Sequence, residues 1–157
     1  MGVKRDGLFP RMTLRDLEGT RRPVEEAWAA GEALVLIGKR DCKTTRQTLP
    51  FVDRIHRRRA AGHGVVVVLQ DDADTARALA ADLGQETPNR LDEDPYPLVA
   101  ELGLEVVPTV FLVGRDGTIL KVTEAFHRKD LEEYAGRLGV PGPLFTPEDK
   151  APAMKPG

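Results

Sequence analysis

The sequence lacks several features on which whole classes of protein depend. It has one cysteine in 157 residues, so an internal disulfide bond is excluded. Its three histidines show no spacing typical of a metal site. The formal net charge is only −2, which gives no overall attraction to nucleic acid or to an anionic membrane. No apolar run approaches the roughly 20 residues of a transmembrane helix, so we expect neither nucleic acid nor a membrane as a partner.

The amino-terminal residues also lack the pattern of a secretory signal. Residues 1–9 carry positive charge, but no apolar stretch follows them. A secretory signal needs such a stretch directly behind its charged residues. The chain as given is therefore expected to be cytoplasmic, and a trimmed exported protein would look the same. A hydrophobic content of 41% suits a soluble domain with a real core.

What is present centres on residues 33–55, which predict a buried strand running directly into a helix. Residues 33–37 are all apolar, as in a strand that is buried on both faces, and Gly38 ends it. From Thr44 onward, apolar residues recur with helical spacing at Leu49, Val52 and Ile55. Cys42 therefore lies at the junction between this strand and this helix.

The predicted position of Cys42 favours a reactive thiol. The first turn of a helix leaves backbone N–H groups unpaired, and a thiolate there gains from these donors and from the positive end of the helix dipole. Asp41 opposes this effect, but four nearby cationic residues add to it: Lys39, Arg40, Lys43 and Arg46. Because cysteine is often simply a small buried apolar residue, a bystander role for Cys42 remains an alternative.

The remaining residues predict alternating strands and helices. We expect a strand pair over 8–18, a short helix over 24–30, a strand over 65–69, helices over 73–83 and 98–102, a hairpin over 110–122 and a helix over 129–138. This order predicts an α/β fold, in which a central mixed β-sheet has helices on both faces and an amino-terminal β extension. Residues 1–139 would form the domain. Residues 140–157 would be a proline-rich tail without helix or strand, either mobile or laid over the surface.

Two charged clusters each allow a structural and a functional interpretation. Asp71, Asp72 and Asp74 could offer carboxylate oxygens to a divalent cation. The structural interpretation, in which Asp72 caps the helix over 73–83, is favoured because the acids lack the spacing of a cation-binding loop. The arginines at 57–59 are interpreted as the cationic end of a helix and not as a phosphate site. No metal or cofactor is therefore predicted.

With these elements in place, the chain resembles the thioredoxin-like superfamily, specifically its TlpA/ResA-like branch and the related AhpC/TSA-type domains. The resemblance covers about residues 8–139. It is carried by Cys42 at the start of a helix that contains Pro50, and by Val107-Pro108-Thr109 before the strand FLV and the turn GRDG. The insertion between the valine strand and Pro108 is also typical of that branch.

The resemblance implies roles for particular residues. Cys42 would be the nucleophile of a thiol–disulfide oxidoreductase. Pro108 would be a cis-proline that lies against this cysteine. The backbone of Val107 would pair with an extended substrate segment, and Lys43 would join Val107 and Pro108 as a substrate-binding residue.

The sequence also departs from the pattern of that family. Where the family has Trp-Cys-x-x-Cys, residues 41–45 read DCKTT, so Thr45 replaces the resolving cysteine. Its hydroxyl could still donate a hydrogen bond to the Cys42 thiolate. The Phe-Trp pair usual at the end of the strand is Ile37-Gly38, and Leu36 stands where classical thioredoxins carry a buried acid. The peroxiredoxin pattern is absent too, since its threonine, three residues before the cysteine, is a lysine here.

Three hypotheses from different classes follow. The favoured one is a monothiol thiol–disulfide oxidoreductase, in which Cys42 attacks, Thr45 stabilises the thiolate and an external thiol such as glutathione resolves the adduct. Its partner would be a protein or a low-molecular-weight thiol or disulfide. The second is a non-catalytic binding or adaptor module that uses the groove beside Pro108. In the third, the fold is retained for structure alone and Cys42 is a bystander.

Overall fold

The centre of the computed structural model, which describes residues 7–157, is a seven-stranded sheet in the order β2-β1-β5-β4-β3-β6-β7. The strands are β1 (Thr13–Arg15), β2 (Arg21–Pro23), β3 (Ala33–Gly38), β4 (Gly64–Leu69), β5 (Asn89–Leu91), β6 (Thr109–Val113) and β7 (Ile119–Glu124). Strands β3, β4 and β5 are parallel, whereas β6 runs antiparallel to β3 and β1 antiparallel to β5. The predicted mixed sheet, with its amino-terminal β extension, is confirmed.

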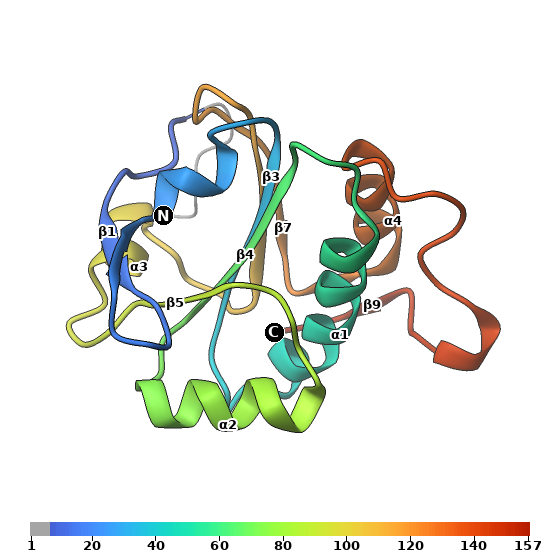
Figure 1. The fold of residues 1–157 in the computed structure, drawn as a ribbon. Coiled ribbons are helices and arrows are strands. Elements are labelled where there is room, and N and C mark those ends of the chain that lie inside the picture. The colour runs from blue at the N-terminus through green and yellow to red at the C-terminus, as the bar shows by residue number, and fades with distance from the viewer. Residues whose placement is uncertain (1–6) are drawn as a thin grey trace.

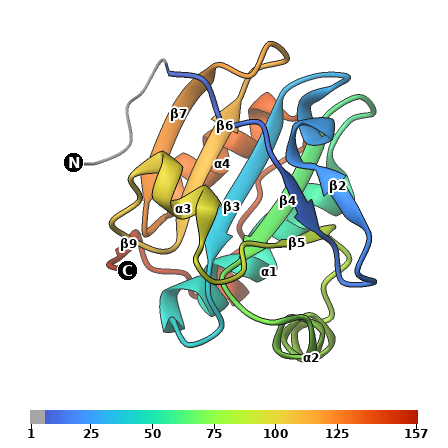
Figure 2. The same cartoon turned by 90° about the vertical axis from the view of Figure 1, so that its left-hand side faces the viewer.

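Helices cover both faces of this sheet (Figures 1 and 2). They are α1 (Lys43–Arg58), α2 (Ala73–Leu83), α3 (Pro97–Leu102) and α4 (Arg128–Arg137), with two 3₁₀ helices, η1 (Val24–Trp28) and η2 (Pro147–Asp149). In Figure 1 the sheet stands between α1 and α4 on one side and η1 and α3 on the other. Residues of α1, α2 and α4 share one hydrophobic cluster, and residues of η1 and α3 share a second one.

Strand β3 holds these two layers together because its side chains alternate between the clusters. Leu34 and Leu36 pack with the α1 side, whereas Val35 and Ile37 pack with the η1 side. All four side chains are completely buried. A fully buried aliphatic side chain contributes about 2 kcal/mol, so this short strand is a large part of the core. The strand also fixes where Cys42 lies, because α1 begins five residues after it ends.

Most predicted elements are confirmed, but the amino-terminal pair lies later than expected. The prediction of a strand pair within residues 8–18 is wrong for its second member, since β2 spans Arg21–Pro23. The turn explains the difference: the carboxylate of Asp16 accepts hydrogen bonds from the backbone N–H groups of Glu18 and Thr20. These bonds close a turn that the spacing of apolar residues does not reveal.

The prediction that residues 140–157 form no helix or strand is also wrong. This segment contains η2 and the strand β9 (Met154–Lys155), which pairs antiparallel with β8 (Phe126–His127). Leu144 is completely buried, and the Phe145 ring lies 4.5 Å from the Phe51 ring. A few apolar residues among prolines and polar residues therefore dock the segment against α1. The segment is laid against the rest of the chain, which is one of the two placements that the sequence allows.

The acidic cluster after β4 has structural partners. Asp72 is the N-cap of α2, and its carboxylate accepts the N–H of Thr75 at 2.8 Å. Asp74 pairs with Arg77, and Asp71 accepts the N–H of Arg40. Across residues 7–157, no group of three or more His, Cys, Asp or Glu side chains is placed to hold a metal ion. Over the same residues, every helix is too short or too polar to cross a bilayer.

Candidate active site around Cys42

Cys42 is the N-cap residue of α1. Its backbone is extended, with φ −90° and ψ 116°, and its Sγ accepts the N–H of Thr45 at 3.4 Å. The sulfur therefore accepts one of the backbone N–H groups that the first turn of a helix leaves unpaired, as the sequence predicts. The half-buried thiol also donates to the backbone oxygen of Val107, 3.5 Å away on the loop before β6.

The surroundings of Cys42 lower the pKa of its thiol. Burial alone raises this pKa, because it penalises the charged thiolate. Hydrogen bonds from the Thr45 side chain, from the backbone N–H groups of Thr45 and Thr44, and the charge of Lys39 outweigh burial. Arg40 is paired with Asp41 at 3.6 Å. The net result is a pKa below the ordinary value for cysteine, which increases the fraction of nucleophilic thiolate.

Thr45 connects Cys42 to the end of β3. The side chain is completely buried, and its Oγ1 accepts the backbone N–H of Lys39 at 3.4 Å. A hydroxyl can accept and donate at the same time. The same oxygen can therefore accept from Lys39 while its hydroxyl hydrogen lowers the pKa of the Cys42 thiol. Thr45 thus offers a hydroxyl and no sulfur one helical turn from Cys42.

The loop before β6 forms the other wall of the site. The Val107–Pro108 peptide bond is cis, and Pro108 is buried. The Pro108 oxygen accepts the N–H of Ala125 at 2.8 Å, and the Thr109 hydroxyl donates to Val106. These bonds hold the Val107 oxygen at the distance from Cys42 given above. The loop and the start of α1 thus bring together residues more than 60 positions apart.

Comparisons with known proteins bear on the fold that carries this site. No protein-family model matches the sequence, and no curated protein matches it. Solved structures do match, including a protein assigned as the thiol:disulfide interchange protein DsbE from Chlorobium tepidum. That match has 20% identity and a TM-score of 0.75, and it covers 87% of this chain and 96% of that one.

Two further matches describe the same architecture. The thioredoxin domain of a thiol-disulfide oxidoreductase from Bacteroides vulgatus is 16% identical with a TM-score of 0.73, over 86% of this chain and 97% of that one. Peroxidoxin BcpB from Mycobacterium tuberculosis is 15% identical with a TM-score of 0.70, over 85% and 94%. The fold is thioredoxin-like.

Within this thioredoxin-like fold, the residues singled out from the sequence lie in two groups. Cys42, Thr45 and Val107 are joined by hydrogen bonds, and Pro108 is buried beside them. Lys43 is the first residue of α1 and is exposed to solvent. Its side chain is therefore accessible to a molecule that binds at the start of this helix.

Sequence reasoning missed Pro156 and Gly157, which contact residues of the site from the last segment of the sequence. The Thr44 hydroxyl donates to the backbone oxygen of Pro156, although the two residues are 112 positions apart. Gly157 lies so close to Val107 that a β-carbon at position 157 would overlap the Val107 oxygen. The sequence carries no local signal for either contact, since both join a helix or a loop to a proline-rich segment.

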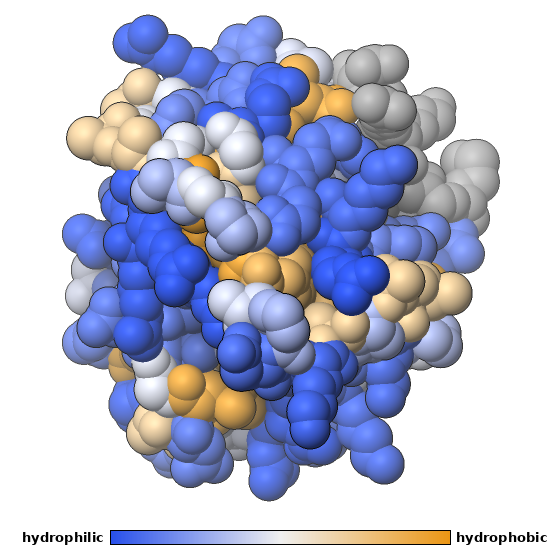
Figure 3. All heavy atoms as spheres, turned by 90° about the vertical axis from the view of Figure 1, so that its right-hand side faces the viewer, coloured by the Kyte–Doolittle hydropathy of each residue, from blue (hydrophilic) through white to orange (hydrophobic). Residues whose placement is uncertain are grey.

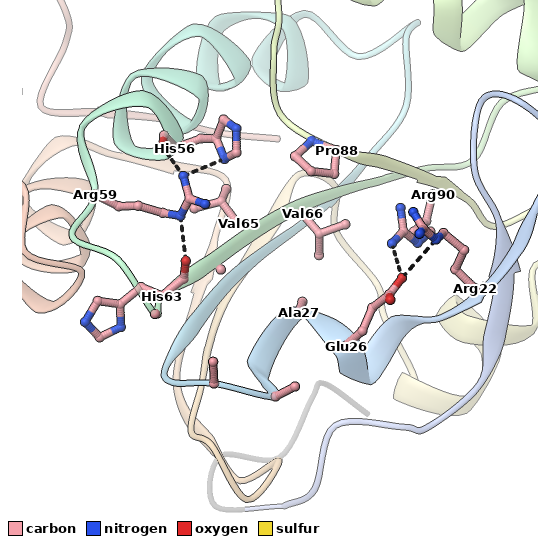
Figure 4. A pocket seen from close by; sticks show the side chains of 14 residues that line it. Arg22, Glu26, Ala27, His56, Arg59, His63, Val65, Val66, Pro88 and Arg90 are labelled. Carbon is pink, nitrogen blue, oxygen red and sulfur yellow. Dashed lines mark hydrogen bonds and ion pairs between the residues drawn. The ribbon is translucent and has the colours of Figure 1, made fainter.

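A separate hollow of about 380 Å³ lies near the other end of α1, and Cys42 is not among its lining residues. Figure 4 shows two polar groups across an apolar floor: Arg22, Glu26 and Arg90 on one side, and His56, Arg59 and His63 on the other. Arg59 is the C-cap of α1 and donates to the backbone oxygens of His56 and His63. The arginine run therefore ends the helix, as the structural interpretation of the sequence predicts.

Proposed function

We propose that this chain is a monothiol thiol–disulfide oxidoreductase with Cys42 as its nucleophile. The observation that carries the proposal is the position of the Cys42 sulfur at the N-cap of α1, where it accepts the N–H of Thr45. A thiolate is the species that attacks a disulfide, and the lowered pKa of Cys42 increases the thiolate fraction relative to an ordinary cysteine. The likeness to structures of thiol-disulfide oxidoreductases supports the same chemistry.

The proposed reaction has two exchange steps. In the first, the Cys42 thiolate attacks one sulfur of a substrate disulfide, forms a new S–S bond and releases the other sulfur as a thiolate. In the second, an external thiolate attacks the mixed disulfide and displaces the Cys42 thiolate, which restores the protein. Each step forms one S–S bond and breaks one, so no other oxidant or reductant is needed.

The external thiol is part of the proposal because position 45 carries a hydroxyl. A dithiol enzyme releases its substrate with its own second sulfur, and Thr45 cannot do this. We therefore assign resolution to a low-molecular-weight thiol such as glutathione. Thr45 has the positioning role of holding a hydrogen-bond donor against the sulfur. Val107, Pro108 and Lys43 would face the substrate.

A non-catalytic binding module is the second candidate. It is favoured by one observation: the space beside Val107 already holds a piece of polypeptide, at Pro156 and Gly157. A groove that accepts a backbone segment could bind a partner without turnover. The two candidate functions differ in whether Cys42 undergoes thiol–disulfide exchange.

Formation and release of a mixed disulfide test the proposal. The protein is incubated with glutathione disulfide, and intact-mass measurement should show one glutathione adduct. Reduced glutathione should then remove it. Cys42→Ser is the matched control and should remain unmodified. Two results together would favour the binding module: the wild type resists glutathionylation, and the pH dependence of iodoacetamide modification gives Cys42 an apparent pKa at or above the free cysteine value of about 8.5.

A further inference from the structure

Residues 153–157, which we call the strap, cross the molecule beside the first turn of α1. Within the strap, β9 pairs with β8 through Met154 opposite His127 and Lys155 opposite Phe126. The backbone oxygen of Ala153 accepts the N–H of Arg128 at 3.0 Å. Figure 1 shows β9 passing α1, with the last residues next to the start of that helix.

The end of the strap contacts residues on both sides of Cys42 in the site, Thr44 on α1 and Val107 on the loop before β6. Pro156 accepts the hydroxyl of Thr44, which is two residues after Cys42. A β-carbon on Gly157 would overlap the Val107 oxygen and would be 2.8 Å from Cγ1 of Val106. The Val107 oxygen is also the partner of the Cys42 sulfur. The Val107 carbonyl oxygen therefore accepts the Cys42 thiol and also lies close to Gly157 of the strap.

The segment before the strap is held more firmly than the strap itself. Arg54 on α1 binds both carboxylate oxygens of Asp149, at 2.8 Å and 3.1 Å. Leu144 is completely buried, and its N–H donates to the carboxylate of Glu132. On the face that carries α1, α4 and this segment, the surface is mainly hydrophilic and its apolar patches are small and separate (Figure 3). The apolar residues of the segment are largely used for its own docking.

The strap, in contrast, is exposed along its length. Each of residues 153–157 is exposed, and β9 is only two residues long. A two-residue pairing, the backbone bond from Arg128 to Ala153 and one side-chain hydrogen bond are a small set of interactions. Solvent-exposed backbone bonds belong to the part of a structure that opens most easily. A firmly anchored segment thus ends in a weakly held one, which contacts the residues beside Cys42.

We propose that the strap is a built-in cover of the Cys42 site, which a polypeptide must displace to reach the sulfur and a small disulfide need not. A second backbone segment cannot take the place of Pro156 and Gly157 against Thr44 and Val107 while the strap is there. The half-buried sulfur remains open to small molecules. The strap would therefore select against polypeptide disulfides until it is released. A regulatory role of the strap rests on the proposed function. The covering itself concerns only the access of other molecules to the Cys42 sulfur.

Two activated disulfides with the same leaving group test the cover. One is the small reagent dithiobis-nitrobenzoate, and the other is a short extended peptide whose cysteine carries thionitrobenzoate. In both reactions the Cys42 thiolate forms a new S–S bond and releases coloured thionitrobenzoate, so the rates are compared directly. Deletion of residues 153–157 should raise the peptide rate by about tenfold and change the small-reagent rate by less than about twofold. Cys42→Ser should release no colour.

Gly157→Val provides a second, independent variant. Its side chain would clash with Val107 and push the strap out, so it should raise the peptide rate as the deletion does. The matched control is Gly136→Val on α4, where a β-carbon would meet nothing within 4 Å. Thermal melting shows that each variant is folded. If the deletion variant does not fold, the peptide rate of Gly157→Val alone tests the cover.

The outcomes separate this inference from the proposed function. Equal peptide rates in the wild type and both folded variants would overturn the cover, even if the glutathione adduct forms. A raised peptide rate together with the absence of a reversible glutathione adduct would support the cover and contradict the oxidoreductase. A raised rate with a reversible adduct would support both.

Discussion

Gly38 and Thr45 lie so close together that a β-carbon at position 38 would be 2.6 Å from Cγ2 and 2.8 Å from Oγ1 of Thr45. Ordinary β-carbons do not approach other heavy atoms to such distances. The glycine at the end of β3 therefore makes room for the threonine on α1. Positions 38 and 45 therefore form a single packing arrangement.

Gly38→Ala should destabilise the protein by about 1–3 kcal/mol, because the added methyl group overlaps the buried Thr45 side chain. Thr45→Ala removes both atoms that the methyl group would strike. In a double-mutant cycle measured by denaturant unfolding, Gly38→Ala should cost less in the Thr45→Ala background than in the wild type. Additivity within about 0.5 kcal/mol would show that the two positions are independent.

Thr45→Val should raise the pKa of Cys42. Valine keeps the shape of threonine and the backbone N–H but removes the hydroxyl that helps to lower this pKa. The pH dependence of iodoacetamide modification measures the shift, and the rate at neutral pH should fall. Thr48→Val is the matched control, since Thr48 is equally buried and its hydroxyl bonds the Thr44 oxygen within the helix. The same pKa in both variants would leave stabilisation of the thiolate to the helix N–H groups alone.

Thr45→Cys should add the missing resolving thiol. The new sulfur would lie one helical turn from Cys42, a spacing that brings two thiols of a helix first turn within bonding reach. The oxidised variant should contain an internal disulfide and reduce insulin to a measurable extent, unlike the wild type. The gain should be modest, because Leu36 still stands where classical thioredoxins have a buried acid. A variant that neither oxidises internally nor reduces insulin would argue against an oxidoreductase.

Asp149→Asn should weaken the docking of the segment after residue 139. Hydrogen bonds from Arg54, followed by that of the Thr146 backbone N–H, lower the pKa of Asp149 from 3.8 to about 2. Because the folded-state pKa is the lower one, the stabilisation is fully present above pH 3.8 and is lost as the pH falls through 2.

Denaturant unfolding at several pH values measures this effect. Asp149→Asn should cost on the order of 1 kcal/mol at pH 7, after allowance for solvent screening, and little near pH 2. Asp82→Asn, on the exposed surface of α2, is the control and should change little at either pH. An equal cost of Asp149→Asn at both pH values would mean that the ion pair does not carry the stabilisation.

The local pattern of the sequence was enough to predict the central elements. The apolar run that became β3 and the helical spacing of Leu49, Val52 and Ile55 are short-range signals, because each depends on neighbours within a few residues. The same holds for Asp72, which caps the helix immediately after it. Cys42 at the start of α1 followed from the junction of two such signals, and its hydrogen bond from Thr45 spans only three residues.

What only the tertiary structure decided involves partners far apart in the chain. The pairing of β9 with β8, the docking of Phe145 against Phe51 and the bond from Thr44 to Pro156 join segments separated by up to 112 residues. A proline-rich stretch has no periodicity to show which of its few apolar residues will find a place in the core. Its position depends on the shape of the surface that α1 and β8 create, and that surface exists only once the rest of the chain has folded.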